Sequence, residues 1–193
     1  MDSSSFPMLE SLSIEVTEHD PPVEGWKLPA SAFKSVVTAI ELSGAPLRAF
    51  QYSHGDCNDA DIHRLINAAH GLELLVVHSI QAPSMALGFA HALAPEEGAI
   101  PLRLLRTLSL SGNLLATGHE QRSAEAIIEL ARRRWAAGAL RELRIGTEGR
   151  VYIPFGGSEV AQNALATIVD GVRDCIAEGL VFKGGSAIGD AHF

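Results

Sequence analysis

Large apolar residues recur along the chain in a short fixed spacing, Leu-x-x-Leu-x-Leu, in which other large apolar residues replace some of the leucines. The last two apolar positions of each unit are two residues apart. This is the side-chain period of a β-strand, so both residues face the same side of a sheet and each unit predicts a strand. The five units are Leu9/Leu12/Ile14, Leu47/Phe50/Tyr52, Leu72/Leu75/Val77, Leu105/Leu108/Leu110 and Leu140/Leu143/Ile145.

Between these units lie segments whose apolar residues follow the three-and-four spacing of one helix face. We expect an α-helix in each, with Asn58 and Asp61 capping the second one. Residues 151–155 are a candidate short strand, and residues 180–182 a candidate sixth repeat strand. The predicted helices are 29–43, 58–70, 83–94, 123–137 and 160–178.

A strand followed by a helix, repeated, requires parallel strands joined by right-handed crossovers. A sheet with helices on both faces would need strands that are apolar almost throughout. Here the residues between the apolar positions are mostly polar, except in the third strand. We therefore predict an α/β solenoid with five or six parallel strands on a concave face and helices on the convex face. One irregular domain is expected over 1–183, followed by a flexible tail at 184–193.

The strand residues that point away from the helices are the expected partner-binding surface, because solenoids commonly bind proteins on their concave face. Leu74 and Val76 would lie at its centre, either as an exposed apolar patch or beneath a loop or the C-terminal tail. The candidate partner-binding residues are Ser13, Gln51, Ser53, Leu74, Val76, His78, Thr107, Ser109, Ser111, Glu142 and Arg144.

One unit, Leu105-x-x-Leu108-x-Leu110-x-x-Asn113-x-Leu115, agrees with the leucine-rich-repeat consensus at every position. The chain therefore resembles leucine-rich-repeat proteins. Its units are about 33 residues apart on average, longer than the roughly 20–29 of regular families. They resemble the degenerate repeats of F-box proteins, in which openings such as Phe6-Pro7-x-Leu9-x-x-Leu12 are frequent.

This resemblance covers about residues 6–182 and implies the substrate-recognition part of a ubiquitin-ligase adaptor. Ubiquitin-ligase components would then be partners if an F-box lies upstream. The sequence departs from the family in having no F-box helical segment, so the ligase contact is assigned to no residue. The chain opens directly on a repeat, and an upstream continuation or a partner is expected to cover that first strand.

The overall charge argues against nucleic-acid and anionic-membrane partners, because the formal net charge is −8. Two cysteines, no signal peptide and no apolar run of the roughly 18–20 residues that span a bilayer predict a cytoplasmic or nuclear protein. Arg132, Arg133 and Arg134 lie at helical spacing from Glu125 and Glu129. We expect them to form a solvated, internally paired helix face.

No motif in the chain predicts catalysis or a cofactor. A Gly-x-Ser-x-Gly elbow, a Gly-x-Gly-x-x-Gly loop and a Walker lysine are all missing from the sequence. Residues 54–63 contain metal-ligand types, but their spacing fits a polar loop and a helix start better than a zinc site. Residues 155–158 indicate a tight turn that caps the last helix with Ser158. We predict a protein that is not an enzyme and holds no metal.

Two alternatives to an interaction scaffold stay open. The first is a small α/β enzyme with a site at the C-terminal strand ends, near His54, His78 and Asn113. The second is a non-functional fragment of a longer repeat protein.

Overall fold

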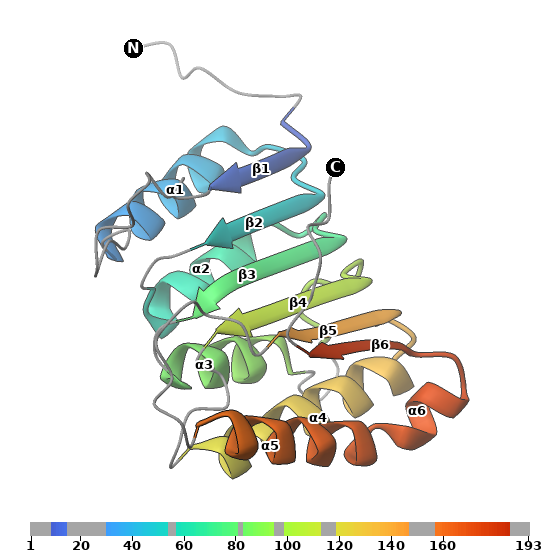
Figure 1. Ribbon diagram of the computed structural model, residues 1–193. Helices are drawn as coiled ribbons and strands as arrows, with labels where there is room; N and C mark the ends of the chain where they lie inside the picture. The colour runs from blue at the N-terminus through green and yellow to red at the C-terminus, as the bar shows by residue number, and fades with distance from the viewer. Residues whose placement is uncertain are drawn as a thin grey trace, which may run out of the picture.

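In the computed structural model, strands and helices alternate along the chain (Figure 1). The structure describes residues 9–14, 30–53, 57–80, 83–94, 99–112, 119–146 and 157–185. The strands are β1 (Ser11–Ile14), β2 (Ala49–Ser53), β3 (Leu74–Ile80), β4 (Thr107–Gly112), β5 (Glu142–Gly146) and β6 (Val181–Gly185). The helices are α1 (Ala30–Ser43), α2 (Asp59–Ala68), α3 (Pro83–Leu93), α4 (Glu120–Ala136), α5 (Gly157–Gly171) and α6 (Arg173–Ala177).

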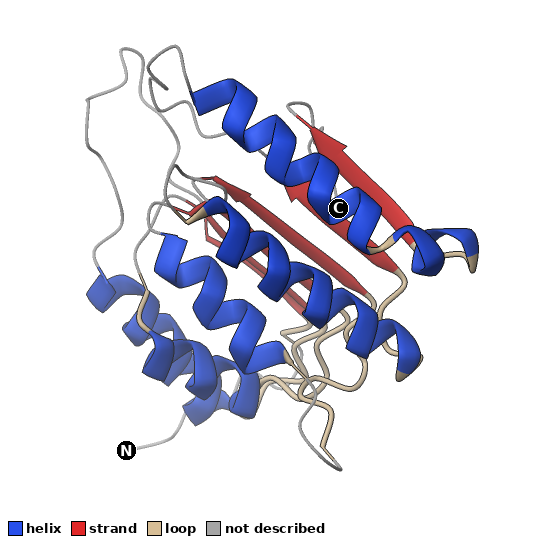
Figure 2. Cartoon of the chain, turned by 90° about the horizontal axis from the view of Figure 1, so that it is seen from below, coloured by secondary structure: helices blue, strands red, loops and turns tan. Residues whose placement is uncertain are grey.

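The six strands of the described part form one parallel sheet, and their order in the sheet is their order in the sequence. The described helices all lie on the same face of this sheet (Figures 1 and 2). Right-handed crossovers explain this arrangement. When every new strand is added on the same side of the previous one, every connecting helix returns over the same face. The sheet therefore has a helix face and an opposite face, which we call the strand face.

The repeat units predicted from the sequence are in register with one another in the sheet. Their second apolar positions form one row across the strands, and their third apolar positions form another. These rows are Leu12, Phe50, Leu75, Leu108 and Leu143, and Ile14, Tyr52, Val77, Leu110 and Ile145. The five predicted strands are thus confirmed, and β6 confirms the sixth.

Both rows belong to the core between the sheet and the helices. From β2 to β5 their side chains are fully buried, as are the first apolar residues of the same units, such as Leu72 and Leu105. From the helices, Phe33 packs edge-on against Tyr52, with ring centroids 4.8 Å apart. Burying one large apolar side chain stabilises a fold by about 1.5–3 kcal/mol. The apolar residues of the Leu-x-x-Leu-x-Leu units therefore form most of the part of the core that the sheet contributes.

Several helix ends agree with local sequence signals. Gly44 and Gly138 follow α1 and α4 with φ of 59° and 69°, the left-handed conformation that glycine adopts without strain. At the start of α2, the backbone N–H of Asp61 donates to Oδ1 of Asn58 at 2.8 Å. The predicted capping pair is thus confirmed.

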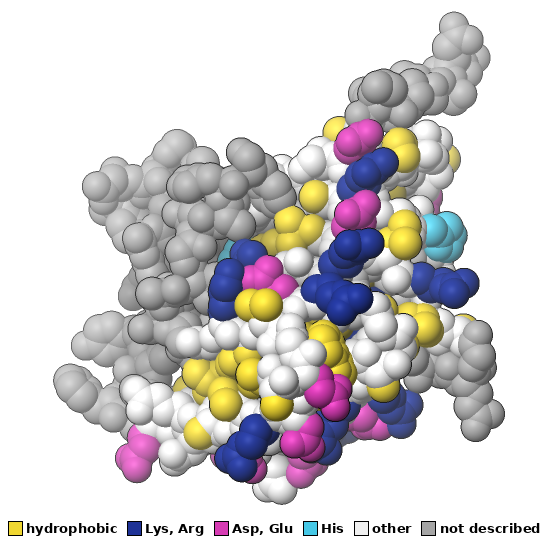
Figure 3. All heavy atoms as spheres, turned by 90° about the vertical axis from the view of Figure 1, so that its right-hand side faces the viewer, with side chains coloured by type: hydrophobic (Ala, Val, Ile, Leu, Met, Phe, Trp, Pro, Cys, Tyr) yellow, Lys and Arg dark blue, Asp and Glu magenta, His cyan; other side chains and the backbone are white. Residues whose placement is uncertain are grey.

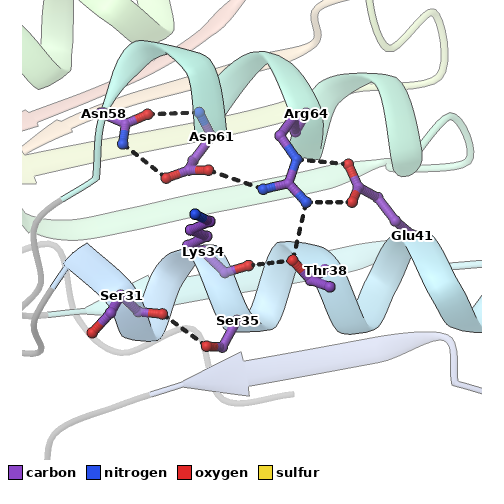
Figure 4. Close-up of polar contacts among 8 residues, drawn as sticks. All are labelled: Ser31, Lys34, Ser35, Thr38, Glu41, Asn58, Asp61 and Arg64. Carbon is purple, nitrogen blue, oxygen red and sulfur yellow. Dashed lines mark hydrogen bonds and ion pairs between the residues drawn. The ribbon is translucent and has the colours of Figure 1, made fainter.

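A polar network joins α1 to α2 on the outside of the helix layer (Figure 4). Arg64 of α2 donates from Nε to Glu41 at 3.0 Å and from Nη2 to Thr38 at 3.0 Å, and both acceptors belong to α1. The same guanidinium donates to Asp61, one turn earlier on α2, at 3.2 Å. The hydrogen bond from Arg64 lowers the pKa of Glu41. These contacts fix the spacing of neighbouring units on their exposed side.

Two predictions near the C-terminus need correction. The single helix predicted over 160–178 is interrupted at Val172, which separates α5 from α6. Gly171, just before the break, packs tightly against α4, because a Cβ atom at this position would lie only 2.5 Å from Ile128. In addition, β6 includes Gly184 and Gly185, which the sequence predicts to belong to the tail. The candidate strand at 151–155 lies outside the described residues.

Candidate interaction surface

The predicted partner-binding residues lie together on the strand face, in three rows that cross the sheet. The first row is Ser11, Ala49, Leu74, Thr107, Glu142 and Val181. The second row is Ser13, Gln51, Val76, Ser109, Arg144 and Lys183. In the third row, Ser53 is in register with His78, and Ser111 with Gly146. Segments far apart in the sequence therefore contribute to one surface.

The middle of this surface is not open to a partner. Ser53, Val76, Ser109 and Ser111 have only 5%, 2%, 1% and 5% of their surface exposed. These four side chains are therefore not accessible in this structure, and Val76 agrees with the alternative in which it is covered rather than an exposed apolar patch. Alternating polar and apolar residues identify the two faces of a strand, but they do not reveal whether the polar face is covered.

The other predicted partner-binding residues are accessible. Ser13 is exposed on β1, and the rest are partly exposed. The partly exposed residues are Gln51, Leu74, His78, Thr107, Glu142 and Arg144. The accessible surface is therefore concentrated in the first row and at the two ends of the second.

A histidine and a serine meet at the C-terminal ends of β3 and β4. Nδ1 of His78 lies 2.8 Å from Oγ of Ser111, a hydrogen-bonding distance. The register between these two strands shifts between Val77 and Ile80, just where His78 lies. The sequence predicted both residues on this face, and the register that pairs Val77 with Leu110 also places His78 opposite Ser111.

A charged cluster occupies the β5–β6 end of the strand face. The guanidinium of Arg144 donates two hydrogen bonds to the carboxylate of Glu142, at 3.0 and 3.1 Å. Lys183 of β6 lies 2.7 Å from the same carboxylate. The hydrogen bonds from Arg144, and then from Lys183, lower the pKa of Glu142 despite its partial burial. This carboxylate therefore remains ionised at neutral pH and fully engaged by its two cations.

The interpretation of the arginine run was wrong at one position. Arg133 pairs with Glu129 on the exposed face of α4, as expected, but Arg134 has no exposed surface. Its Nη1 donates to the carbonyls of Leu93 and Pro101 at 3.1 and 2.8 Å, and its Nη2 donates to that of Leu102 at 2.8 Å. Through these hydrogen bonds, Arg134 connects α4 to the end of α3 and to the turn before β4.

The spacing of the apolar residues could have identified this buried arginine. On α4, position 134 continues the buried stripe of Ile127, Leu130 and Ala131 at helical spacing. Burial lowers the pKa of Arg134 to about 10, which still leaves the group charged at neutral pH. Leu102 adopts a φ of 46°, which is rare for a residue other than glycine, and its carbonyl accepts from both Arg134 and the backbone N–H of Leu105.

The segments considered for metal or anion binding are only partly described. His54 to Asp56 lie outside the described residues, as do Asn113 and residues 155–156. In the described part of the chain, no three His, Cys, Asp or Glu side chains are grouped so that they could hold a metal ion. Asn58 and Asp61 serve as the helix cap, in agreement with the interpretation of this segment as a helix start.

Among the described residues, no helix combines the length and the apolar character that crossing a bilayer requires. Comparison of the chain with protein-family models, with curated proteins and with solved structures finds no match. The function must therefore be inferred from the arrangement of the chain's own residues.

Proposed function

We propose that the chain is a leucine-rich-repeat-type solenoid that binds a partner protein on its strand face. The observation that supports this proposal is the agreement between the repeat units and the sheet register, in which equivalent residues of five units lie side by side. Stacked units present equivalent positions in straight rows, and solenoid proteins use such rows as extended binding surfaces.

The first row of the strand face is the part best suited to a partner. Leu74 is partly exposed near its centre and is flanked by Ala49 and Thr107, while Glu142 lies further along the row. Six strands separated by about 4.8 Å give a row about 24 Å long, enough for one helix or loop of a partner. A partly exposed apolar side chain near the middle of a surface is a common arrangement at the centre of an interface.

The proposal is tested by placing a photo-crosslinking side chain at Thr107 on the strand face or at Leu42 on the exposed surface of α1. We expect Thr107 to crosslink a discrete partner protein in the cells that express the chain. Leu42, which is 79% exposed but lies on the opposite side of the fold, is expected to yield no such product. The products are identified by mass spectrometry.

A substitution gives an independent criterion. Leu74→Arg should reduce the yield of the Thr107 crosslink at least about tenfold, as expected for a residue near the centre of an interface. Circular dichroism must show that the variant remains folded. If the same proteins crosslink from Thr107 and from Leu42, or if Leu74→Arg has no effect on the yield, the strand face is not the binding surface.

A narrower form of this proposal is the substrate-recognition part of a ubiquitin-ligase adaptor. It is supported only by the resemblance of the repeats, and Phe6 and Pro7 of the F-box-like opening lie outside the described residues. The geometry of the strand face suits any protein partner of the right shape, so it does not favour this narrower form over the general one.

The contact between His78 and Ser111 favours a second candidate function, a hydrolase. A histidine within about 2.6–3.2 Å of a serine hydroxyl can act as its general base, and the observed distance is 2.8 Å. If this pair is catalytic, ester hydrolysis by the protein should fall about 100-fold in both His78→Ala and Ser111→Ala. Equal rates of p-nitrophenyl acetate hydrolysis in the three folded proteins would reject the hydrolase.

A further inference from the structure

Five charged residues lie in a line along the N-terminal edge of the sheet, each one residue before a strand. Their order across the sheet is Glu10, Arg48, Glu73, Arg106 and Arg141. We call these residues the edge row. Figure 3 looks onto this edge and shows positive and negative side chains gathered in one column.

Backbone hydrogen bonds hold the edge row straight. The carbonyl of each of its first four residues accepts from two consecutive N–H groups of the next unit. For example, the carbonyl of Glu73 accepts from Arg106 at 2.8 Å and from Thr107 at 3.0 Å. These carbonyls are therefore used within the fold, while the charged side chains of the row are exposed or partly exposed to solvent.

The charges of the edge row are only partly balanced within the fold. Arg48 lies 3.6 Å from Glu73; the arginine side chain is largely exposed and the glutamate side chain partly so. Among the described residues, neither Arg106 nor Arg141 has a carboxylate within ion-pair distance, although Arg141 lies over the ring of Trp135, 5.9 Å from its centroid. Glu142, which follows Arg141, is bound by two other cations.

Arg106 and Arg141 are both exposed and precede neighbouring strands, in a chain whose formal net charge is −8. Like charges side by side on adjacent strands destabilise a sheet. A negatively charged partner would remove this repulsion on binding. Across the row the charges are negative, positive, negative, positive and positive. This order differs when it is read from the other end, so it can select one orientation of that partner.

We propose that the edge row binds an α-helix of a partner protein that carries acidic residues on two consecutive turns, opposite Arg106 and Arg141, and a basic residue on the next turn, opposite Glu73. The spacing favours a helix, because one turn rises about 5.4 Å and neighbouring strands are about 4.8 Å apart. In an extended peptide, residues on one face are about 6.6 Å apart. Such a peptide loses register with the strands after fewer residues than a helix does.

The mixed charge of the row disfavours a nucleic acid. A phosphate backbone carries uniform negative charge, so Glu10 and Glu73 would repel it, and so would the overall charge of −8. This inference extends the proposed protein-binding function to a second surface, which adjoins the first row of the strand face.

The experiment uses a synthetic, fluorescently labelled alanine-based peptide of about 20 residues, long enough to form a helix. It carries glutamates on two consecutive turns and a lysine on the next, and a second, reversed peptide carries lysine in place of the two glutamates and keeps the lysine opposite Glu73. We expect saturable binding of the first peptide by fluorescence anisotropy. The double variant Arg106→Glu/Arg141→Glu should weaken this binding at least about tenfold and should bind the reversed peptide instead.

The control double variant is Arg122→Glu/Arg132→Glu on the exposed surface of α4, which changes the net charge equally. It should alter the affinity less than about twofold. Equal weakening in both double variants, no binding by the unmodified protein, or tighter binding of a single-stranded RNA of similar length would each overturn the proposal. Because the probe is a peptide, these outcomes leave the crosslinking result from Thr107 unaffected.

Discussion

Arg134→Met is expected to lower the free energy of unfolding by about 3 kcal/mol. The buried carbonyls of Leu93 and Leu102 would lose their side-chain donor. A buried acceptor that is left without a hydrogen bond costs about 1–3 kcal/mol. The carbonyl of Pro101 loses its donor as well. Methionine fills much of the same space without supplying a hydrogen bond. Urea unfolding followed by circular dichroism measures the effect.

Arg133→Met provides the matched control, because it removes the neighbouring arginine of the same helix. That side chain is 54% exposed and pairs with Glu129 at the surface. A change of less than about 0.5 kcal/mol is expected there, as for most exposed ion pairs. If the Arg134 and Arg133 variants unfold at the same urea concentration, Arg134 does not hold the end of α3 and the turn before β4 in place.

Ser109→Arg is expected to destabilise the protein by at least about 3 kcal/mol, because it forces a charge into a buried position. Ser109 is only 1% exposed, and its neighbours in the same row are Val76 and Arg144. The new guanidinium would lie next to the apolar side chain of Val76 on one side and the positively charged Arg144 on the other. The midpoint of thermal unfolding and the urea midpoint should both fall.

Thr107→Arg is the control, on the same strand and the same face two residues earlier. Thr107 is partly exposed and in register with Glu142, so an arginine there meets water and a carboxylate. We expect a change of less than about 1 kcal/mol. If Ser109→Arg is as stable as Thr107→Arg, water reaches the middle of the strand face and Ser109 is not buried in solution.

Most of the α/β arrangement could be predicted from the sequence, because it depends on short-range spacing. The two-residue separation of Leu108 and Leu110, repeated in the other units, specifies which side chains face the helices. When the repeat units are aligned by these leucines, the aligned residues are also the ones that pair between neighbouring strands. Helix starts such as Asn58 also depend on neighbours in the sequence, so they were predictable.

The candidate site was less predictable, since burial on the strand face depends on the whole fold. Val76 and Ser109 occupy positions that alternate with core residues, and nothing in that alternation indicates that they are covered. The contact of His78 with Ser111 joins residues 33 apart in the sequence, so predicting it requires the pairing register of β3 and β4. For Arg134, the place on the apolar stripe of α4 decides its burial, although its charge and its arginine neighbours indicate a solvated position.

The linear strand order has a consequence for how such a chain can change in length. Within the described residues, substantial contacts between elements join only neighbours in the sheet, neighbours in the helix layer, or a helix and its adjoining strand. A whole unit could therefore be inserted or removed with new packing required at a single junction, while distant units keep their surroundings. Genes of this kind can lengthen or shorten by duplication and loss of one strand–helix pair without a redesign of the rest.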